Sequence, residues 1–341
     1  MKIKIDQNST LPLYRQVISA VKEALRNGKL KNGDPMPSLS ELAGMTGISP
    51  ETAKKAYNLL KKENLIGSRQ GKGYFIDVRE SGAPLRILML VDKLSAYKLA
   101  IHKGLTEALV QNADVSINIH NQDIELFDKL VCDATGEFDW YIIAAHFPRE
   151  VSTARIARTL KRLPNNRTIL IDNGLPQFKG NIGRVYQDFR EDASHALKDA
   201  LGMIHKYDSV EIITTANSLY GDIICPQIRK LFRSEGIRCR IEQQFNPEQM
   251  SAGTLYIVLC GQLDNDHFTL IREANRRGYV LGQDIGLISY NDEPVNEFIC
   301  GGLSSISSDF TQMGHSVAEM INSGKLSCIH NPFRLIVRSS L

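Results

Sequence analysis

The sequence lacks the features that mark membrane, secreted and disulfide-linked proteins. No apolar run approaches the ~18 residues that a membrane-spanning helix requires. Residues 1–6 alternate charged and apolar side chains and are followed by polar ones, so no secretory signal peptide is expected. The six cysteines show no C-x-x-C motif and no Cys/His pairing at zinc spacing; they are Cys132, Cys225, Cys239, Cys260, Cys300 and Cys328. We therefore expect a cytoplasmic protein with reduced cysteines and without a metal site.

Little in the sequence indicates an enzyme. No GxGxxG follows the first strand pattern of the long C-terminal part, and no GxxxxGK[ST] loop is present. No nucleophile–base pair stands out, and no lysine has a context that suggests a cofactor Schiff base, so no cofactor is expected. An enzyme that acts on a sugar, a phosphorylated sugar or a nucleotide stays open as an alternative.

Charge is distributed unevenly along the 341 residues. Residues 1–79 hold 14 Lys and Arg against 7 Asp and Glu, whereas the remainder holds 27 against 31. A basic segment joined to a mildly acidic one predicts that the N-terminal part alone binds a polyanion. The length predicts two or three compact units. We expect a head over residues 1–79, a short polar linker over 80–84 and a body over 85–341.

Residues 37–73 carry the signals of two short helices joined by a tight turn. Ser38 is a good N-cap, and Glu41 follows three residues later, where its carboxylate can bond the cap amide. Ser49 then caps a second helix whose first residue is Pro50, a position that needs no N–H. We expect one apolar face on this helix, formed by Ala53, Ala56, Tyr57 and Leu60, and a polar outer face formed by Thr52, Lys54, Lys55, Asn58, Lys61 and Lys62.

A hairpin with a glycine-rich tip follows, with strands expected at 65–69 and 74–78. A basic helix face fits the major groove, and a tip of this kind fits a phosphate or the minor groove. A structural unit whose lysine face is merely solvated is the alternative. The candidate DNA contacts are Ser38, Ser40, Ser49, Thr52, Lys54, Lys55, Asn58, Arg69, Gln70, Gly71, Lys72 and Gly73.

These residues resemble the winged helix-turn-helix of the GntR family of bacterial transcription regulators over positions 10–78. Members of that family often have arginines where this chain has Ser40 and Pro50, so base contacts are expected from Thr52, Lys54, Lys55 and Asn58 instead. The resemblance lies in the segments Pro12–Val17, Gly33–Ser38, Glu41–Ala43, Gly47–Ser49, Thr52, Ala56–Tyr57, Leu60 and Gly71–Ile76.

From residue 86 onward, apolar strand patterns alternate with helical patterns. This alternation predicts an α/β body made of parallel sheets that are covered on both faces, in two lobes of about five strands each. We expect helices near 97–111, 122–134, 149–162, 190–205, 221–235, 266–278 and 309–322. Strands are expected at 86–92, 115–120, 140–146, 167–173, 184–187, 209–215, 237–243, 254–260, 285–290 and 303–307.

Sheets of this kind bind ligands beyond the carboxyl ends of their strands. The polar and aromatic residues at those ends suit a neutral, polyhydroxylated ligand. Each has a structural alternative: His146 as a buried structural histidine, Asp309 as a helix cap, and Asp172 and Asp188 as acceptors for loop amides. The candidates are Ser95, Tyr97, Lys98, His146, Asp172, Asp188, Tyr220, Asp222, Gln262, Asn291, Asp292 and Asp309, with Asn291 and Asp292 the preferred pair.

The segments Gly282–Asp292, Leu303–Ile306, Asp309–Phe310 and Met313–Gly314 are similar to the closing part of the LacI/GalR-type and periplasmic sugar-binding domains. The resemblance implies two lobes joined by three chain crossings, a ligand between the lobes, and dimerisation through the sides of the lobes. Tyr220 and Asp222 stand where that family often has an arginine that binds sugar hydroxyls. Together, the two resemblances match the arabinose-repressor type of regulator.

We therefore expect a homodimeric repressor of carbohydrate-utilisation genes that binds operator DNA and is relieved by a monosaccharide such as arabinose or fucose. A phosphosugar is the second candidate ligand, because Lys98 lies near an expected helix N-terminus. An architectural DNA-binding protein whose body has lost its ligand is a further alternative, and it predicts that no ligand binds.

Overall fold

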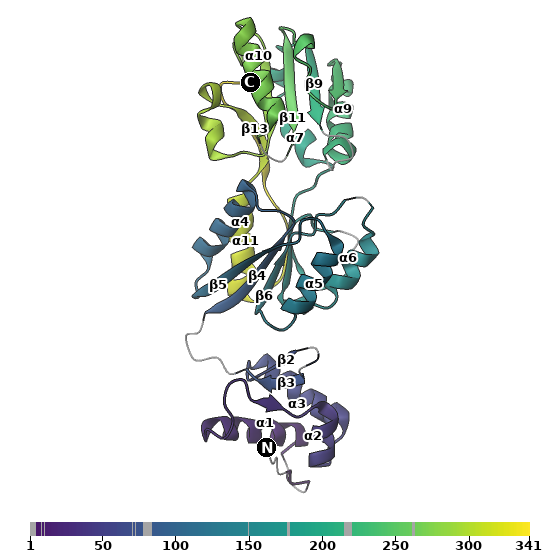
Figure 1. Cartoon of the computed structure of the whole chain (residues 1–341), viewed down its shortest axis with the longest axis vertical. Helices are drawn as coiled ribbons and strands as arrows, with labels where there is room; N and C mark the ends of the chain where they lie inside the picture. The colour runs from purple at the N-terminus through teal and green to yellow at the C-terminus, as the bar shows by residue number, and fades with distance from the viewer. Residues whose placement is uncertain are drawn as a thin grey trace. The chain divides into compact units, whose positions relative to one another are not determined.

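The computed structural model describes all but a few short segments of the chain. The chain divides into two compact units. The first consists of residues 1–87, 111–114 and 129–139, and the second consists of residues 88–110, 115–128 and 140–341. Within the sequence, a head is followed by two lobes, and each is described on its own (Figure 1). The described residues are 5–7, 9, 11–69, 71, 73–77, 84–148, 150–175, 178–214, 220–260 and 263–341, without the side chains of Arg26 and Tyr220.

The head is a three-helix unit with a small antiparallel sheet. Its sheet has the order β1-β3-β2, and the two-residue strand β1 pairs with β3. Fully buried apolar side chains from all three helices form the core. The elements are α1 (Leu13–Arg26), β1 (Pro35–Met36), α2 (Leu39–Thr46), α3 (Pro50–Lys62), β2 (Ile66–Arg69) and β3 (Gly73–Ile76).

The predicted helix caps of the head are confirmed. Ser38 Oγ accepts from Glu41 N at 3.2 Å, and the Glu41 carboxylate accepts from Ser38 N at 2.8 Å, which is a complete capping box. Ser49 Oγ accepts from Thr52 N at 3.1 Å, and Pro50 is the first residue of α3. Gly47 ends α2 with a φ of 68°, a left-handed conformation that glycine adopts without strain.

The first lobe is a six-stranded sheet with the order β14-β8-β7-β6-β4-β5. Its strands are β4 (Leu85–Val91), β5 (Ala113–Ile119), β6 (Trp140–Ile143), β7 (Thr168–Asp172), β8 (Gly183–Tyr186) and β14 (Cys328–His330). The main helices of this lobe are α4 (Ala96–Ala108), α5 (Ile124–Ala134), α6 (Thr153–Leu160) and α11 (Phe310–Ser323).

Helices α4 and α11 of the first lobe approach each other closely at two glycines. A Cβ atom added to Gly104 would lie 2.2 Å from the carbonyl oxygen of Thr311, and one added to Gly314 would lie 2.2 Å from that of Ile101. Neither position therefore accepts a larger residue without a backbone shift. This contact fixes α4, whose N-terminal residues Tyr97 and Lys98 are candidate ligand contacts.

The second lobe is a six-stranded sheet with the order β10-β9-β11-β12-β13-β15. Strand β15 runs antiparallel to β13, whereas the other neighbouring strands are parallel. The strands are β9 (Ser209–Thr214), β10 (Cys239–Glu242), β11 (Thr254–Leu259), β12 (Gly286–Tyr290), β13 (Ser304–Ser308) and β15 (Phe333–Ile336). The helices are α7 (Asp192–Lys198), α8 (Leu201–Ile204), α9 (Cys225–Ser234) and α10 (Asn265–Arg277).

The chain passes between the two sheets three times: after β8, after β13 and between β14 and β15. Two of these crossings are bonded to each other, because Asp309 N donates to Pro332 O at 2.9 Å. Asn331 is buried and donates to Ser308 Oγ at 2.7 Å. The predicted two-lobed α/β architecture with parallel sheets is thus confirmed.

The structure corrects several predicted elements. Residues 190–205 do not form one helix, because the chain breaks near Ala200 between α7 and α8. The segment predicted as a helix over 221–235 begins with a π-helical turn, η2 (Tyr220–Ile224), before α9. Strands β1, β14 and β15 were not predicted. Residues 80–83 of the predicted linker lie outside the described part of the chain. None of the helices described has the length and apolar character needed to cross a bilayer.

Candidate functional site

The outward face of α3 carries the side chains predicted to contact DNA. Lys54, Lys55 and Asn58 are exposed, whereas the predicted apolar face of the helix is buried in the head. The Lys55 ammonium lies 4.1 Å from the centre of the Tyr14 ring, and Lys54 is 3.9 Å from the Glu51 carboxylate. The arrangement is a cationic helix surface with one amide, which suits phosphates and base edges of a major groove.

Lys61 corrects part of the predicted outward face. Its ammonium donates to Ser68 Oγ at 2.6 Å and lies 4.9 Å from the centre of the Tyr74 ring. Burial lowers the pKa of Lys61. The prediction that Lys61 belongs to the outer face is wrong, because its long side chain reaches back to the hairpin instead.

Several predicted DNA contacts also have structural partners. Ser38 and Ser49 are the N-caps of α2 and α3, and the Thr52 hydroxyl lies 2.8 Å from Ser49 Oγ. Ser40 is exposed on α2. The two caps leave helix N-termini at the surface, where backbone N–H groups can bind phosphate. Contact of these four residues with DNA stays a prediction.

The hairpin tip is described only in part. Gly71 and Gly73 are exposed and have φ values of 81° and 76°, which a residue with a side chain adopts at a cost. Arg69 forms an ion pair with Glu137. Gln70 and Lys72 lie outside the described residues. The predicted roles of this group in DNA binding remain untested by the geometry.

In the first lobe, Lys98 is the centre of a buried charged cluster. Its Nζ lies 2.6 Å from Oδ2 of Asp172 and 3.5 Å from Oδ1 of Asp92. Only 1% of the Lys98 side chain and 3% of each carboxylate side chain are exposed. Because an isolated buried charge is very costly, the three groups depend on one another.

His146 and Gln187 complete the cluster around Asp172. His146 Nε2 lies 2.9 Å from Asp172 Oδ2, and Gln187 Nε2 donates to Oδ1. Burial raises the pKa of Asp172, but the charge of Lys98 and the contacts with His146 outweigh it and hold the pKa well below its usual range. Asp172 is therefore ionised at neutral pH, accepts hydrogen bonds from Lys98 and Gln187, and lies against the imidazole of His146.

Asp92 and Gln187 were not among the predicted contacts. Both lie at the carboxyl end of a strand in the first lobe, Asp92 directly after β4 and Gln187 directly after β8. The rule that ligands bind at such ends would have identified both. The structure thus brings Lys98, His146 and Asp172 together as predicted candidates and adds two residues to them.

Several buried polar groups at strand ends have no hydrogen-bond partner within the described part of the chain. They include Gln187 Oε1 after β8 and Thr214 Oγ1 at the end of β9. Buried polar atoms are nearly always bonded to protein, water or ligand. A polyhydroxylated ligand near these ends would supply the missing partners.

The start of α4 combines polar and aromatic groups beside this cluster. Ser95 is the buried N-cap residue of α4, and Tyr97 packs on Phe310 with the ring centres 4.8 Å apart. The Lys98 ammonium lies 4.9 Å from the centre of the Tyr97 ring. Burial raises the pKa of Tyr97, so its hydroxyl stays protonated at neutral pH.

In the second lobe, Asn291 and Asp292 follow β12 but differ in their surroundings. Asn291 is buried, has a φ of 68°, and donates its backbone N–H to Ile306 O at 2.9 Å. Asp292 binds both terminal nitrogens of Arg338, at 2.7 and 3.0 Å, and accepts from Asn296 at 3.2 Å and from Ser305. The carboxylate of Asp292 is therefore occupied by its own lobe, and Arg338 was not anticipated.

The other predicted ligand contacts have mixed surroundings. Asp309 caps α11 by accepting from Gln312 N at 2.9 Å, and Asp188 accepts from Arg190 N at 2.9 Å. Asp222 lies in the π-helical turn η2 before α9. The Tyr220 side chain and Gln262 lie outside the described residues. Roles for these residues in ligand binding stay predictions.

Comparisons with known proteins agree with the two parts of the chain. Residues 13–76 match the model of bacterial regulatory proteins of the gntR family. The N-terminal domain is a GntR-type winged helix-turn-helix. The repressor YtrA of Bacillus subtilis is 40% identical over 74 residues, which are 22% of this chain and 57% of YtrA. This chain therefore covers just over half of the length of YtrA. The 74 aligned residues are about as many as the GntR-type domain contains.

Solved structures show the fold of the body. A dimeric Lac repressor with a C-terminal deletion aligns with a TM-score of 0.59 and 14% identity, covering 75% of this chain and 98% of that one. A LacI family regulator from Enterococcus faecalis with bound ribose aligns with a TM-score of 0.55 and 20% identity, covering 75% and 98%. At these identities the likeness shows the fold, which is that of LacI-type regulators.

Proposed function

We propose that this protein is a transcriptional repressor that binds operator DNA as a homodimer and releases or rearranges on it when a monosaccharide binds the body. The observation that carries the proposal is a GntR-type head on a body that has the LacI-type fold and a preformed polar cluster at the strand ends of its first lobe. Such a protein acts in the cytoplasm, where operator DNA lies.

The head supports DNA binding through its surface chemistry. Lys54 and Lys55 are exposed on α3 together with Asn58, so cations meet phosphates while one amide reaches a base edge. Because the head is small, two copies in a symmetric dimer would read two half-sites. The solved relative of the same body fold is described as a dimer, which supports this oligomeric state.

The charge of the first-lobe cluster favours a neutral sugar over a phosphosugar. Lys98 is already paired with two carboxylates, Asp92 and Asp172. A phosphate near the cluster would face two buried carboxylates and a lysine that is already paired with both of them. The carboxylate, amide and imidazole groups instead suit hydroxyls, as in arabinose or fucose.

The rival functions have less support. An enzyme requires a nucleophile and base or a bound cofactor, whereas the carboxylates of Asp172 and Asp292 at the strand ends are held in ion pairs and that of Asp309 caps a helix. The YtrA relative and the solved relatives are named as repressors and regulators. An architectural protein would bind no ligand, which is a result that the following experiment can give.

A thermal-shift panel of neutral monosaccharides and their phosphates tests the ligand. A ligand at about 100 times its Kd adds about 2.7 kcal/mol to the stability of the folded state. We expect a shift with a pentose or deoxyhexose and none with the matching phosphate. A shift with the phosphate alone would contradict the neutral-sugar proposal, and no shift with any sugar would favour the architectural alternative.

Sequence-specific DNA binding is tested with an operator site that the unaltered protein selects from a pool of random DNA sequences. Asn58→Ala should lose roughly 1–3 kcal/mol of discrimination between that site and random DNA. Lys55→Ala should weaken both DNAs alike and reduce the salt dependence, because it removes a phosphate contact in each subunit. Equal losses on both DNAs for Asn58→Ala would show that this residue does not read sequence.

A further inference from the structure

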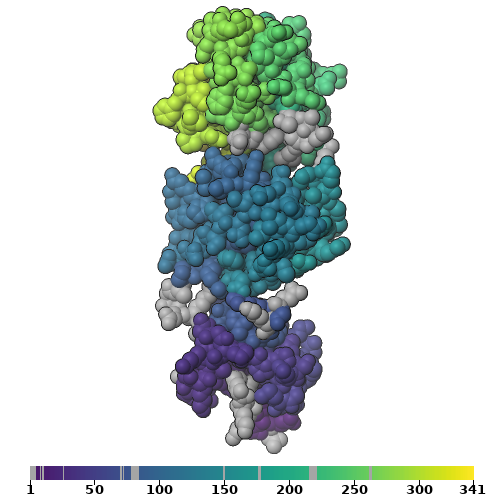
Figure 2. All heavy atoms as spheres, in the orientation of Figure 1, coloured from purple at the N-terminus to yellow at the C-terminus, as the bar shows by residue number. Residues whose placement is uncertain are grey.

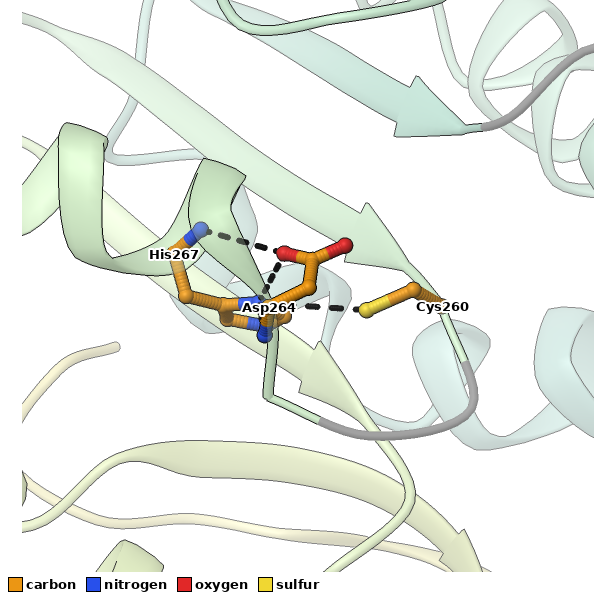
Figure 3. Close-up of side chains that lie close together, drawn as sticks. All are labelled: Cys260, Asp264 and His267. Atoms are coloured by element: carbon orange, nitrogen blue, oxygen red, sulfur yellow. Dashed lines mark hydrogen bonds and ion pairs between the residues drawn. The ribbon is translucent and has the colours of Figure 1, made fainter.

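Three side chains with metal-binding atoms meet where β11 leads into α10. Cys260 directly follows β11, Asp264 is the N-cap of α10, and His267 is in its first turn. Their sulfur, oxygen and nitrogen atoms lie within 4.8 Å of one another. Figure 3 shows the three side chains turned toward one another, with the thiol and the carboxylate beside the imidazole.

The distance between Cys260 and His267 is close to that in a tetrahedral zinc site, whereas the distance between Asp264 and His267 is shorter. Zinc–sulfur bonds of about 2.3 Å and zinc–nitrogen bonds of about 2.0–2.1 Å place the two ligand atoms about 3.6 Å apart. Cys260 Sγ and His267 Nδ1 are 3.8 Å apart. Asp264 Oδ1 lies 2.9 Å from His267 Nδ1, a hydrogen-bond distance. An ion that replaces the shared proton would separate these two atoms by about 0.5 Å, which a small side-chain rotation allows.

His267 is held from behind in the orientation that a metal ligand needs. It is fully buried, and its Nε2 lies 3.0 Å from Ser289 Oγ in β12. Histidines that bind a metal normally donate the other ring N–H to an oxygen atom. With Nε2–H on Ser289, the Nδ1 lone pair faces Cys260 and Asp264. Without an ion, Nδ1 has the backbone N–H of Asp264 3.3 Å away, the Asp264 carboxylate 2.9 Å away and the Cys260 thiol 3.8 Å away.

We propose that Cys260, Asp264 and His267 bind one zinc ion, with water as the fourth ligand. The thiolate and the imidazole select a borderline-soft ion, whereas magnesium and calcium prefer oxygen ligands. The thiolate and the carboxylate together balance the charge of Zn²⁺, so the filled site is neutral despite its partial burial. The ion would tie the end of β11 to the start of α10.

Metal titration of the full-length protein tests the site. The protein is stripped with a chelator and titrated with Zn²⁺ in competition with a chromophoric chelator, and separately with Co²⁺. We expect one tightly bound zinc ion per chain and a cobalt spectrum with a thiolate charge-transfer band. Failure to compete for zinc, or bound cobalt without that band, would overturn the proposal and leave a hydrogen-bonded helix cap.

Three variants separate the ligands from the fold. Cys260→Ser should bind zinc more than about 100-fold more weakly and lose the cobalt band, because loss of a ligand exceeds the effect of a supporting residue. Asp264→Asn keeps a good N-cap but loses the charge, so it should weaken zinc binding without unfolding α10. Cys300→Ser, an exposed cysteine of the same lobe, is the matched control and should bind as the unaltered protein does.

The supporting residue gives a graded result. Ser289→Ala should weaken zinc binding by about 10–100-fold while keeping the cobalt–thiolate band, because it removes only the bond that orients His267. Zinc should also raise the unfolding temperature of the unaltered protein and leave that of Cys260→Ser unchanged. Equal zinc affinity in Cys260→Ser and the unaltered protein would place the ion elsewhere and refute the assignment.

Discussion

The two lobes carry an acidic or amide residue in a left-handed conformation at the end of a central strand. Asp172 ends β7 in the first lobe, and Asn291 follows β12 in the second; both have a φ of 68°. Backbone strain of this kind persists where the surroundings fix it, and it gathers at binding sites. The two lobes differ in the side chains that pair with the carboxylate at this position, which is Asp172 in the first lobe and Asp292, next to Asn291, in the second.

In the first lobe, the partners of Asp172 come from other strand ends and from the start of α4. Lys98, His146 and Gln187 all bond its carboxylate from the same edge of the sheet. In the second lobe, Asp292 is bound by Arg338, three residues from the last residue of the sequence. That pair fastens the segment after β12 to the edge of the sheet.

This segment forms part of the surface of the second lobe, where Figure 2 shows it in lime and yellow. It includes Phe298, which is 80% exposed. The comparison teaches that an acidic residue after a strand is not by itself a ligand contact. Asp172 and Asp292 are both paired within their own lobe, and the Asp172 cluster is the proposed site because Gln187 beside it keeps a buried oxygen without a partner among the described residues.

Replacing Lys98 should have the largest effect. Lys98→Met leaves two buried carboxylates without their cation and should lower the free energy of unfolding by about 3–5 kcal/mol, with loss of sugar binding. Urea unfolding at neutral pH measures this change. Lys103→Met is the control, because Lys103 is exposed on the same helix and its loss should cost less than about 1 kcal/mol. Equal losses for the two variants would contradict the buried-cluster account.

Replacing Asp292 should affect stability more than sugar binding. Asp292→Ala removes charged hydrogen bonds to Arg338 and should cost about 1.5–3 kcal/mol of unfolding free energy. The loss of sugar-binding free energy, measured by calorimetry, should be smaller than this loss of unfolding free energy. A variant of unchanged stability that no longer binds sugar would restore Asp292 as a direct ligand contact.

Replacing Asn291 should affect sugar binding more than stability. Asn291→Gly keeps the left-handed backbone, because glycine adopts a φ of 68° freely, and removes the amide side chain. We expect about 0.5–1.5 kcal/mol less sugar-binding free energy, equivalent to the loss of one hydrogen bond. The operator affinity of the sugar-free protein should stay the same. If sugar affinity is unaffected, Asn291 does not contact the ligand.

The pH dependence should be the smallest effect. The pKa of Asp172 is depressed in the folded state, so its stabilising contribution is complete above its unfolded value of about 3.9 and is lost as the pH falls below it. The difference in unfolding free energy between the unaltered protein and Asp172→Asn should be constant from about pH 5 to 8 and shrink in stronger acid. A difference that changes between pH 6 and 8 would mean that another group titrates in the cluster.

The head was predicted from local signals, and most of them are confirmed. The capping box at Ser38 and Glu41, the Ser49 cap and Pro50 act within four residues, so their chemistry is visible in the sequence. Strand β1 was missed because two residues show no period. The inward turn of Lys61 was missed because it depends on Ser68 in the folded hairpin.

The fold of the body was predicted from its alternating strand and helix patterns. The contacts within its candidate site join residues that are far apart in the sequence. The strands of the two sheets were recognisable as apolar runs, but β14 and β15 depend on partners at least 25 residues earlier in the sequence. Lys98, His146 and Asp172 were expected at strand ends. Their mutual contacts, and the pairing of Asp292 with Arg338, join residues between 26 and 74 positions apart and could not be read from local spacing.

The most direct test of the repressor proposal is the affinity of the full-length protein for its selected operator with and without the sugar that gives the largest thermal shift. Fluorescence anisotropy at fixed salt would measure it, with Lys103→Met as a control for the α4 surface. The account predicts that saturating sugar weakens operator binding by about 5–150-fold, a coupling of about 1–3 kcal/mol. Operator affinity that is unchanged while the sugar is bound would contradict it.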